Sequence, residues 1–244
     1  MQEINRTIYI TNMNKKILIK LSGEALSNGG SDYNKVVLER IADQIKKLLS
    51  EDYQVALVLG GGNLFRGAEL VEKIAVKRPT ADYIGMLAIA QNALVLRDYF
   101  EHMGISTRVS SAIGMAQVCE PYIPKRVERH LKKGRVVILA AGLGQPYFSS
   151  DSTCVQRALE LGFDMVVMAK NGVDGVYTAN PDTDPNATKI DTISASSVLE
   201  QGLAFADHAA VSLARENGLA LKVIGMDDIN RLGEKGLGTL VTAD

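Results

Sequence analysis

Glycine residues gather at the ends of predicted buried strands, and this placement points to phosphate binding. Gly23 follows one strand, residues 60–62 are three consecutive glycines after another, and Gly142 and Gly144 follow a third. Glycine-rich strand ends let backbone N–H groups approach an anion closely, and the N-terminus of a following helix favours phosphate. One cluster alone would fit a tight turn equally well. Several clusters at one edge of a sheet favour a phosphate site.

Four charged residues stand where they could act on a phosphate. Lys20 ends an apolar strand, so its ammonium group either reaches the surface or faces an anion. Arg66 lies beside the triple glycine, where a guanidinium suits bidentate phosphate recognition, and a surface arginine is the alternative. Asp151 and Asp207 each stand at a predicted helix start, and helix capping is the simpler explanation for both.

Common phosphate-binding and nucleophile motifs are absent. No glycine is followed by lysine, which excludes the GxxxxGK[ST] loop, and residues 60–65 lack the third glycine of GxGxxG. HRD and DFG triplets and the GxSxG motif do not occur either. The histidines, His102, His130 and His208, lie in predicted helices and are interpreted as ordinary surface or packing residues. Phosphoryl transfer remains, because its catalysis rests on positioning and charge stabilisation without a covalent nucleophile.

Predicted strands and helices alternate along the chain. Strands, several of them apolar runs typical of burial on both faces, are predicted at residues 17–21, 55–59, 105–109, 136–140, 165–168, 221–224 and 239–241. Helices are predicted from an Asp32 cap to Leu48, from a Thr80 cap to His102, and over residues 124–133, 151–161 and 207–217. Turn signals after Val173 predict short strands and loops. This order predicts an α/β fold with a largely parallel sheet, helices on both faces and a ligand site beyond the carboxyl ends of the strands.

Composition narrows the class of protein. The 244 residues carry 28 acidic and 27 basic side chains, a net charge of −1, which argues against a basic nucleic-acid-binding domain. Cys119 and Cys154 form neither a CxxC motif nor a disulfide framework, so a reducing compartment is expected. Residues 1–16 lack a signal-peptide h-region, and apolar runs such as residues 136–141 are too short for a membrane span. We therefore expect a cytoplasmic protein without membrane or nucleic-acid partners.

Six short motifs follow one another along the chain. They are KILIKLSGEAL at residues 16–26, GGGNLFRG at 60–67, DYIGMLA at 82–88, SSDS at 149–152, VDGVY at 173–177 and GLGTL at 236–240. The first motif resembles the opening of the amino acid kinase superfamily. The second is more specific and resembles the bacterial uridylate (UMP) kinases, and the other four extend that match in order. The resemblance covers nearly the whole chain, from about Lys16 to Val241.

The resemblance implies a three-layer αβα sandwich that assembles as a homohexamer. It implies transfer of the γ-phosphoryl group of ATP to UMP, giving UDP and ADP in pyrimidine nucleotide biosynthesis, with Mg²⁺ accompanying ATP. Residues 16–244 would form one amino acid kinase domain, with an acceptor-side part over about 16–165 and an ATP-side part over about 166–244. Residues 1–15 would be a flexible N-terminal extension, and Met13 is an alternative start to Met1.

The resemblance also assigns roles to residues. Lys20, Asp151 and Asp207 would be catalytic, with the lysine stabilising charge on the transferring phosphoryl group. The ATP-binding residues would be Lys20, Ser22, Gly23, Gly62, Arg66, Tyr177 and Asn180. The UMP-binding residues would be Gly61, Gly62, Arg66, Asp82, Leu143, Gln145, Phe148, Ser149 and Ser150. No residue is assigned as a metal ligand.

Three positions in the implied nucleotide sites depart from the family pattern. Leu143 and Gln145 stand where the family often has threonine and asparagine on the loop facing uracil. Because leucine lacks the hydroxyl group, base selectivity stays open. Asn180 replaces a frequent aspartate on the ATP side, and its amide still offers a hydrogen-bond acceptor.

The resemblance implies regulation as well. A GTP activator site between subunits would use Arg97, Arg108 and Arg135, and UTP would be a feedback inhibitor. Glu101 and Pro124 replace a histidine and an aromatic residue found in some members, so activation by GTP stays open. Two other functions also stay open. One is a kinase of the same superfamily acting on an amino-acid carboxylate or a small phosphate, and the other is a non-catalytic nucleotide-binding protein.

Overall fold

A nine-stranded sheet forms the middle layer of the protein. A computed structural model describes residues 15–27, 32–65, 71–72 and 75–244, and the sheet lies within these residues. Its strand order is β4 (Glu120–Pro121), β3 (Thr107–Ser111), β5 (Val136–Ala140), β2 (Gln54–Leu59), β1 (Lys16–Leu21), β6 (Met165–Lys170), β10 (Ala220–Gly225), β11 (Thr239–Thr242) and β9 (Thr192–Ser194). Neighbouring strands are parallel except β10 and β11. The predicted, largely parallel sheet is confirmed.

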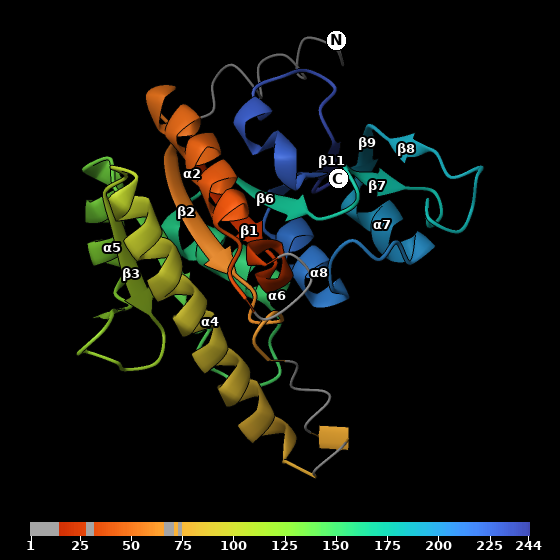
Figure 1. Cartoon of the computed structure of the whole chain (residues 1–244). Helices are drawn as coiled ribbons and strands as arrows, with labels where there is room; N and C mark the ends of the chain where they lie inside the picture. Colours follow the sequence, from red (N-terminus) through yellow and green to blue (C-terminus); the bar gives the residue numbers. More distant parts are fainter. Residues whose placement is uncertain (1–14, 28–31, 66–70, 73–74) are drawn as a thin grey trace.

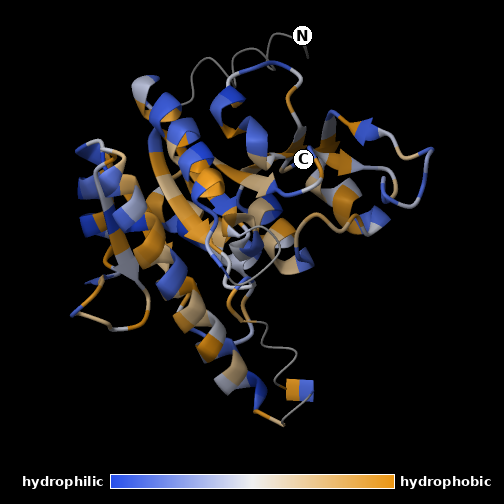
Figure 2. Ribbon diagram, in the orientation of Figure 1, coloured by the Kyte–Doolittle hydropathy of each residue, from blue (hydrophilic) through white to orange (hydrophobic). Residues whose placement is uncertain are grey.

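Helices cover both faces of this sheet (Figure 1). One face carries α2 (Lys35–Ser50), α4 (Arg78–His102) and the 3₁₀ helix η2 (Met226–Arg231). The other face carries α5 (Pro124–Lys132), α6 (Ser150–Leu161), α7 (Ala195–Gln201) and α8 (His208–Glu216). A separate hydrophobic core lies on each side, and the strands between the helices are strongly hydrophobic (Figure 2). The expected three-layer αβα sandwich is confirmed.

Strand β1 shows how the two cores arise from one sequence run. Its side chains alternate between faces, so Ile17 and Ile19 enter the core under α2 and α4 while Leu18 enters the core under α6 and α8. All three are fully buried. By the same alternation Lys20 points toward the α6 and α8 layer, at the end of an otherwise apolar strand.

The start of α2 differs from the prediction. Asn34 is its N-cap instead of Asp32, because the Asn34 side chain accepts hydrogen bonds from the amides of Val36 and Val37. Asparagine and aspartate cap helices about equally well. The choice between them therefore depends on where the chain turns, which residue type alone does not reveal.

Two further boundaries move by a short distance. Helix α4 begins at Arg78, ahead of the predicted Thr80 cap, with Pro79 in its first turn, where proline's missing N–H has no intrahelical partner to lose. Strand β3 begins at Thr107 instead of Ile105, because the amide of Ile105 donates to a carbonyl at the end of α4.

The segment after Val173 contains the short strands that its turn signals predict. β7 (Val176–Tyr177) and β8 (Lys189–Ile190) form a small antiparallel pair beside the main sheet (Figure 1). Helix α7 was not predicted. Its N-cap Ser194 accepts a hydrogen bond from the Ser197 amide. The helix is only seven residues long, too short for a clear period in its hydrophobic residues.

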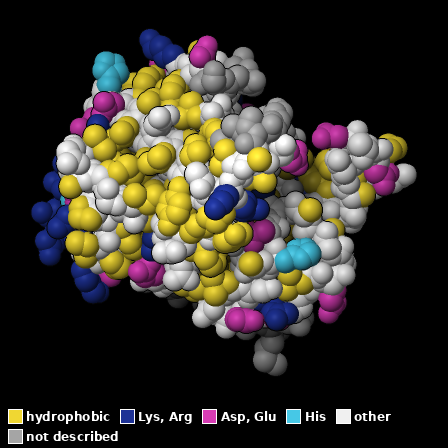
Figure 3. Space-filling model, turned by 90° about the horizontal axis from the view of Figure 1, so that it is seen from below, with side chains coloured by type: hydrophobic (Ala, Val, Ile, Leu, Met, Phe, Trp, Pro, Cys, Tyr) yellow, Lys and Arg dark blue, Asp and Glu magenta, His cyan; other side chains and the backbone are white. Residues whose placement is uncertain are grey.

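The N-terminal part of α4 extends beyond the rest of the molecule (Figure 1). Tyr83 and Leu87 lie in this part of α4, and 43% and 47% of their surface is exposed. Hydrophobic side chains are spread over the side of the molecule that is seen from below in Figure 3. An exposed apolar helix face of this kind is typical of a protein contact. Neither α4 nor any other helix in the described part of the chain is both long and apolar enough to cross a membrane.

Candidate active site

The turns after β1 and β2 touch backbone to backbone at the carboxyl edge of the sheet. A Cβ atom on Gly23 would lie 2.6 Å from the Gly60 carbonyl oxygen and 2.8 Å from the Gly62 amide nitrogen. None of the glycines in these two turns has a positive φ. The glycines therefore serve the close approach of two backbones, and the alternative of a left-handed tight turn does not apply here.

A buried amide holds this double turn in place. Asn92, in the middle of α4, is fully buried, and its Nδ2 donates to the Gly60 carbonyl at 2.7 Å and to Asn63 Oδ1 at 2.8 Å. Its Oδ1 accepts from Tyr33 Oη at 2.9 Å and from Asn63 Nδ2 at 3.1 Å. Every hydrogen-bonding group of the Asn92 side chain is thus used. Sequence reasoning missed this residue, although a polar residue on the buried side of a helix was a possible signal.

Lys20 lies inside the protein and faces Asp151. Its Nζ is 3.1 Å from Asp151 Oδ1, and the two side chains are only 11% and 15% exposed. Lys20 is therefore not a surface lysine. Asp151 is not the N-cap of α6 either, because Ser149 takes that position and its Oγ accepts from the amides of Asp151 and Ser152.

Asp207 joins the N-termini of α6 and α8. It is the N-cap of α8, as its sequence position predicts, and its Oδ1 accepts from the Ala210 amide at 2.8 Å. The same carboxylate accepts hydrogen bonds from the hydroxyl groups of Ser149 and Ser152. Burial opposes ionisation, but these hydrogen bonds outweigh it and hold the pKa of Asp207 below its ordinary value.

This lowered pKa predicts a pH-dependent contribution of Asp207 to stability. A carboxyl group whose folded-state pKa is depressed stabilises the protein above its unfolded pKa, near 3.8, and loses that contribution as pH falls through the folded pKa. We expect Asp207→Ala to lower the free energy of unfolding by about 1 kcal/mol at pH 7. Urea unfolding of both proteins should show this difference shrinking below about pH 4. A difference that grows on acidification would contradict the assignment.

A cavity of about 380 Å³ lies between the turn after β2, helix α4 and the start of α6, the helix that carries Asp151. The predicted UMP-binding residues that line it are Gly61, Gly62, Asp82, Leu143, Gln145, Phe148, Ser149 and Ser150. The structure thus brings together eight positions from three separate segments of the chain. Arg66, predicted for both nucleotides, lies outside the described residues.

Asp82 is fixed on one wall of this cavity. Arg78 Nε donates to its Oδ1 at 2.8 Å, and the Tyr147 amide donates to its Oδ2 at 2.9 Å. Arg78 also lines the cavity and brings a cation that sequence reasoning missed, although its spacing from Asp82 on one helix was a signal. Ala141 and Tyr147 have positive φ values of 59° and 72°, so the loop carries backbone strain next to the residues that line the cavity.

The predicted ATP-side residues lie along the ends of β1 and β7. Ser22 and Gly23 form the turn into the 3₁₀ helix η1 (Gly23–Leu26). The hydroxyl group of Tyr177 donates to Asp174 Oδ1 at 2.6 Å, which raises the pKa of Tyr177. Lys189 pairs with Asp174 Oδ2 at 2.8 Å, and the two contacts together lower the pKa of Asp174. Asn180 is exposed, and its Oδ1 accepts from a nearby backbone amide.

The three arginines of the implied GTP site each contact a different neighbour. Arg97 pairs with Asp98 at 2.7 Å, and Arg108 pairs with Glu101 at 2.9 Å. Arg135 lies 3.1 Å from His130 Nδ1. These contacts within one chain leave the effector assignment a prediction.

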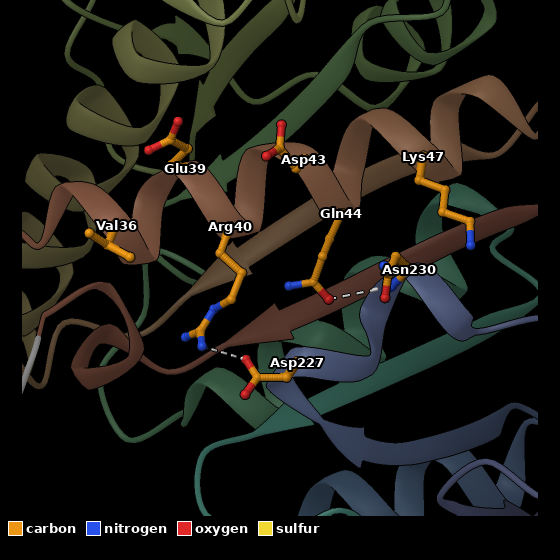
Figure 4. A pocket seen from close by; sticks show the side chains of 8 residues that line it. All are labelled: Val36, Glu39, Arg40, Asp43, Gln44, Lys47, Asp227 and Asn230. Atoms are coloured by element: carbon orange, nitrogen blue, oxygen red, sulfur yellow. Dashed lines mark hydrogen bonds and ion pairs between the residues drawn. The ribbon is translucent and has the colours of Figure 1, made fainter.

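A second hollow, of about 440 Å³, lies between α2 and η2 (Figure 4). The Arg40 side chain crosses it to Asp227 at 2.8 Å, and Gln44 bonds to the Asn230 amide (Figure 4). Arg40 and Asp227 form an ion pair within this lining, and none of the predicted site residues lines the hollow. The predicted site residues therefore favour the cavity at the carboxyl edge of the sheet as the candidate site.

Comparison with known proteins identifies the class that this fold and site define. The sequence pattern of the amino acid kinase family matches residues 15–225, so the chain belongs to the amino acid kinase family.

Particular relatives narrow the match. A uridylate kinase of Nocardioides sp. is 48% identical over 94% of this chain and 98% of its own length. A uridylate kinase of Tropheryma whipplei is 51% identical over 88% of this chain and 92% of its own length. Among solved structures, UMP kinase from Bacillus anthracis superposes with a TM-score of 0.90 at 38% identity, covering 94% of this chain and 96% of that chain.

Proposed function

We propose that this protein is a UMP kinase that transfers the γ-phosphoryl group of ATP to UMP, giving UDP and ADP for pyrimidine nucleotide biosynthesis. The observation that carries the proposal is Lys20, a buried cation held by Asp151 at the carboxyl edge of β1. It lies where the glycine turns meet and beside a cavity lined by the predicted UMP residues. The uridylate kinases that are 48% and 51% identical to this chain over most of its length support the same activity.

The chemistry follows from charge. ATP and UMP are both anionic, so their approach is repulsive unless cations and N–H donors offset it. Lys20 supplies a cation with little reorganisation, because Asp151 already fixes its ammonium group. The UMP phosphate is ionised and needs no general base, so Asp151 and Asp207 position other groups instead of removing a proton.

The cavity would hold the acceptor. Gly61 and Gly62 offer backbone N–H groups to the UMP phosphate, and Ser150 lies at the start of α6, whose N-terminus favours an anion. Asp82 would accept from the ribose through Oδ1, which accepts one hydrogen bond from Arg78, whereas Oδ2 already accepts from both Arg78 Nε and the Tyr147 amide. Leu143 and Gln145 would face the base.

Mg²⁺ would enter with ATP. In the described residues no group of three His, Cys, Asp or Glu side chains could hold a metal ion. Mg²⁺ commonly uses phosphate oxygens and water with only one or two carboxylates, so this donor set fits an ion held chiefly by the nucleotide. When bound, it would neutralise charge on the β- and γ-phosphates.

A coupled assay tests the activity. We expect UDP formation from ATP and UMP, with much weaker turnover of CMP and none of aspartate, acetylglutamate or carbamate. Turnover of one of the last three instead of UMP would favour the related small-substrate kinase. Tight nucleotide binding with no UDP formed at any Mg²⁺ concentration would favour a non-catalytic nucleotide-binding protein.

The assembly and its regulation extend this proposal. The exposed apolar face of α4 supports self-association, and a homohexamer is the state that the resemblance implies. GTP activation through Arg97, Arg108 and Arg135 and inhibition by UTP are proposed with it. Cys119 and Cys154 are both buried free thiols, which supports a cytoplasmic location.

A further inference from the structure

A second lysine ends the strand beside Lys20. Lys170 is the last residue of β6, and its Cα pairs with Gly225 of β10 at the carboxyl edge of the sheet. The register pairs Lys20 with Met168. Because side chains two residues apart share a face, Lys170 leaves the sheet on the same side as Lys20, toward α6.

Lys170 differs from Lys20 in having no counter-ion. Its side chain is half-buried and forms no hydrogen bond or ion pair with any residue that the structure describes. Its burial and the charge of Lys20 both lower its pKa, and Asp151 opposes them only in part. Two neighbouring ammonium groups therefore share one carboxylate, which already pairs with Lys20.

Other carboxylates at this strand end are occupied. Asp174 and Asp228 both lie near Gly225, within 3.5 Å of where its Cβ would stand. Asp174 pairs with Lys189 at 2.8 Å, and Asp228 pairs with Arg231 at 2.7 Å. An excess of positive charge thus remains between the ends of β1 and β6, and a half-buried excess of this kind suits a polyanion.

We infer that Lys170 is a second substrate-contacting cation, which binds the phosphate chain of the nucleoside triphosphate donor alongside Lys20. Ser22 and Gly23 form the turn that continues from β1 next to Lys170's strand, so N–H donors and two ammonium groups would face the same phosphates. The inference rests on the proposed function, because it assigns a new residue to the donor side of that site.

Lys170→Met removes the charge while keeping much of the side-chain volume, and Lys170→Arg keeps the charge. We expect Lys170→Met to raise the Kd for ATP by about tenfold or more, as loss of a charged hydrogen bond does, and to lower kcat. The KM for UMP should change by less than about twofold, and Lys170→Arg should recover most ATP binding. Titration calorimetry and steady-state kinetics measure these quantities.

Lys222→Met is the matched control. Lys222 is also a half-buried lysine of the sheet, whose burial lowers its pKa, but its Cα pairs with Val167, so it lies on the other face from Lys170. Its replacement should leave ATP binding unchanged. If Lys170→Met does not fold, Lys170→Gln supplies the same comparison with a polar side chain.

Two outcomes separate this inference from the proposed function. Wild-type affinity for ATP and unchanged kcat in the folded Lys170 variants would overturn it. Weaker ATP binding in those variants, together with no UDP formed by the unmodified protein, would support the lysine's contact with the nucleotide and contradict UMP kinase activity.

Discussion

Replacing Lys20 with alanine is expected to lower kcat for UDP formation by about 10²-fold or more, the usual effect of losing one charge-stabilising group. Lys20 is buried, its Nζ is fixed 3.1 Å from Asp151, and it lies at the carboxyl edge of the central strand. The substitution also leaves the Asp151 carboxylate buried without its cation, so stability should fall as well. Coupled UDP assays and urea unfolding measure the two effects.

A double variant separates the two effects. Lys20→Ala with Asp151→Asn removes both charges, so we expect it to recover part of the lost stability but none of the lost activity. Near-normal kcat in Lys20→Ala would remove Lys20 from the reaction. Recovery of activity together with stability in the double variant would mean that Lys20 acts only through folding.

Adding one methyl group at Gly23 is expected to have the second largest effect. The new Cβ would lie less than 3.0 Å from backbone atoms of Gly60 and Gly62, so the two turns must separate. We expect Gly23→Ala to cost about 1–3 kcal/mol of stability, as overpacking does. Activity should fall by about 10²-fold or more, because a misplacement of about 1 Å at a site has this effect.

Gly114→Ala is the matched control, because nothing lies within 4 Å of the position that its Cβ would take and its φ is not positive. It should keep both stability and activity. If Gly23→Ala behaved like this control, the contact between the turns would have no functional importance. Thermal unfolding and the UDP assay of the two variants decide the matter.

The strands were predictable because both of their faces are buried. β5 is apolar throughout and β2 is apolar after Gln54, so a continuous run of Val, Ile, Leu and Ala identified each strand without any partner being known. The glycines at their carboxyl ends then indicated the edge on which the site lies. The likeness to a known family added the roles of individual residues.

Side chains that act across the fold could not be predicted from local pattern. Asp151 stands at a helix start and reads as a cap, but its partner is Lys20, far away along the chain. Ser149, two residues earlier, caps the helix instead. The local sequence shows which residues are able to cap a helix. Only the tertiary fold shows which of them caps the helix and which pairs with a distant residue instead.

Polar residues in apolar helices were missed for a related reason. Asn92 interrupts the buried side of α4, and its value lies in the Gly60 carbonyl and in Asn63, which belong to another segment. Arg78 likewise stands out only through its hydrogen bond to Asp82 and its place in the lining of the cavity, which the loop after β5 also lines. The sequence alone does not distinguish either residue from other polar residues of a helix, because the contacts of each depend on the tertiary fold.

The position of β1 in the sheet means that its surroundings are completed only late in the synthesis of each chain. β1 is made first, yet it is bordered by β2 on one side and by β6 on the other. Lys20 needs α6 for its partner, and the α6 cap needs Asp207 at the start of α8. A nascent chain that lacks its last quarter lacks Asp207, and with it the contact that joins the starts of α6 and α8.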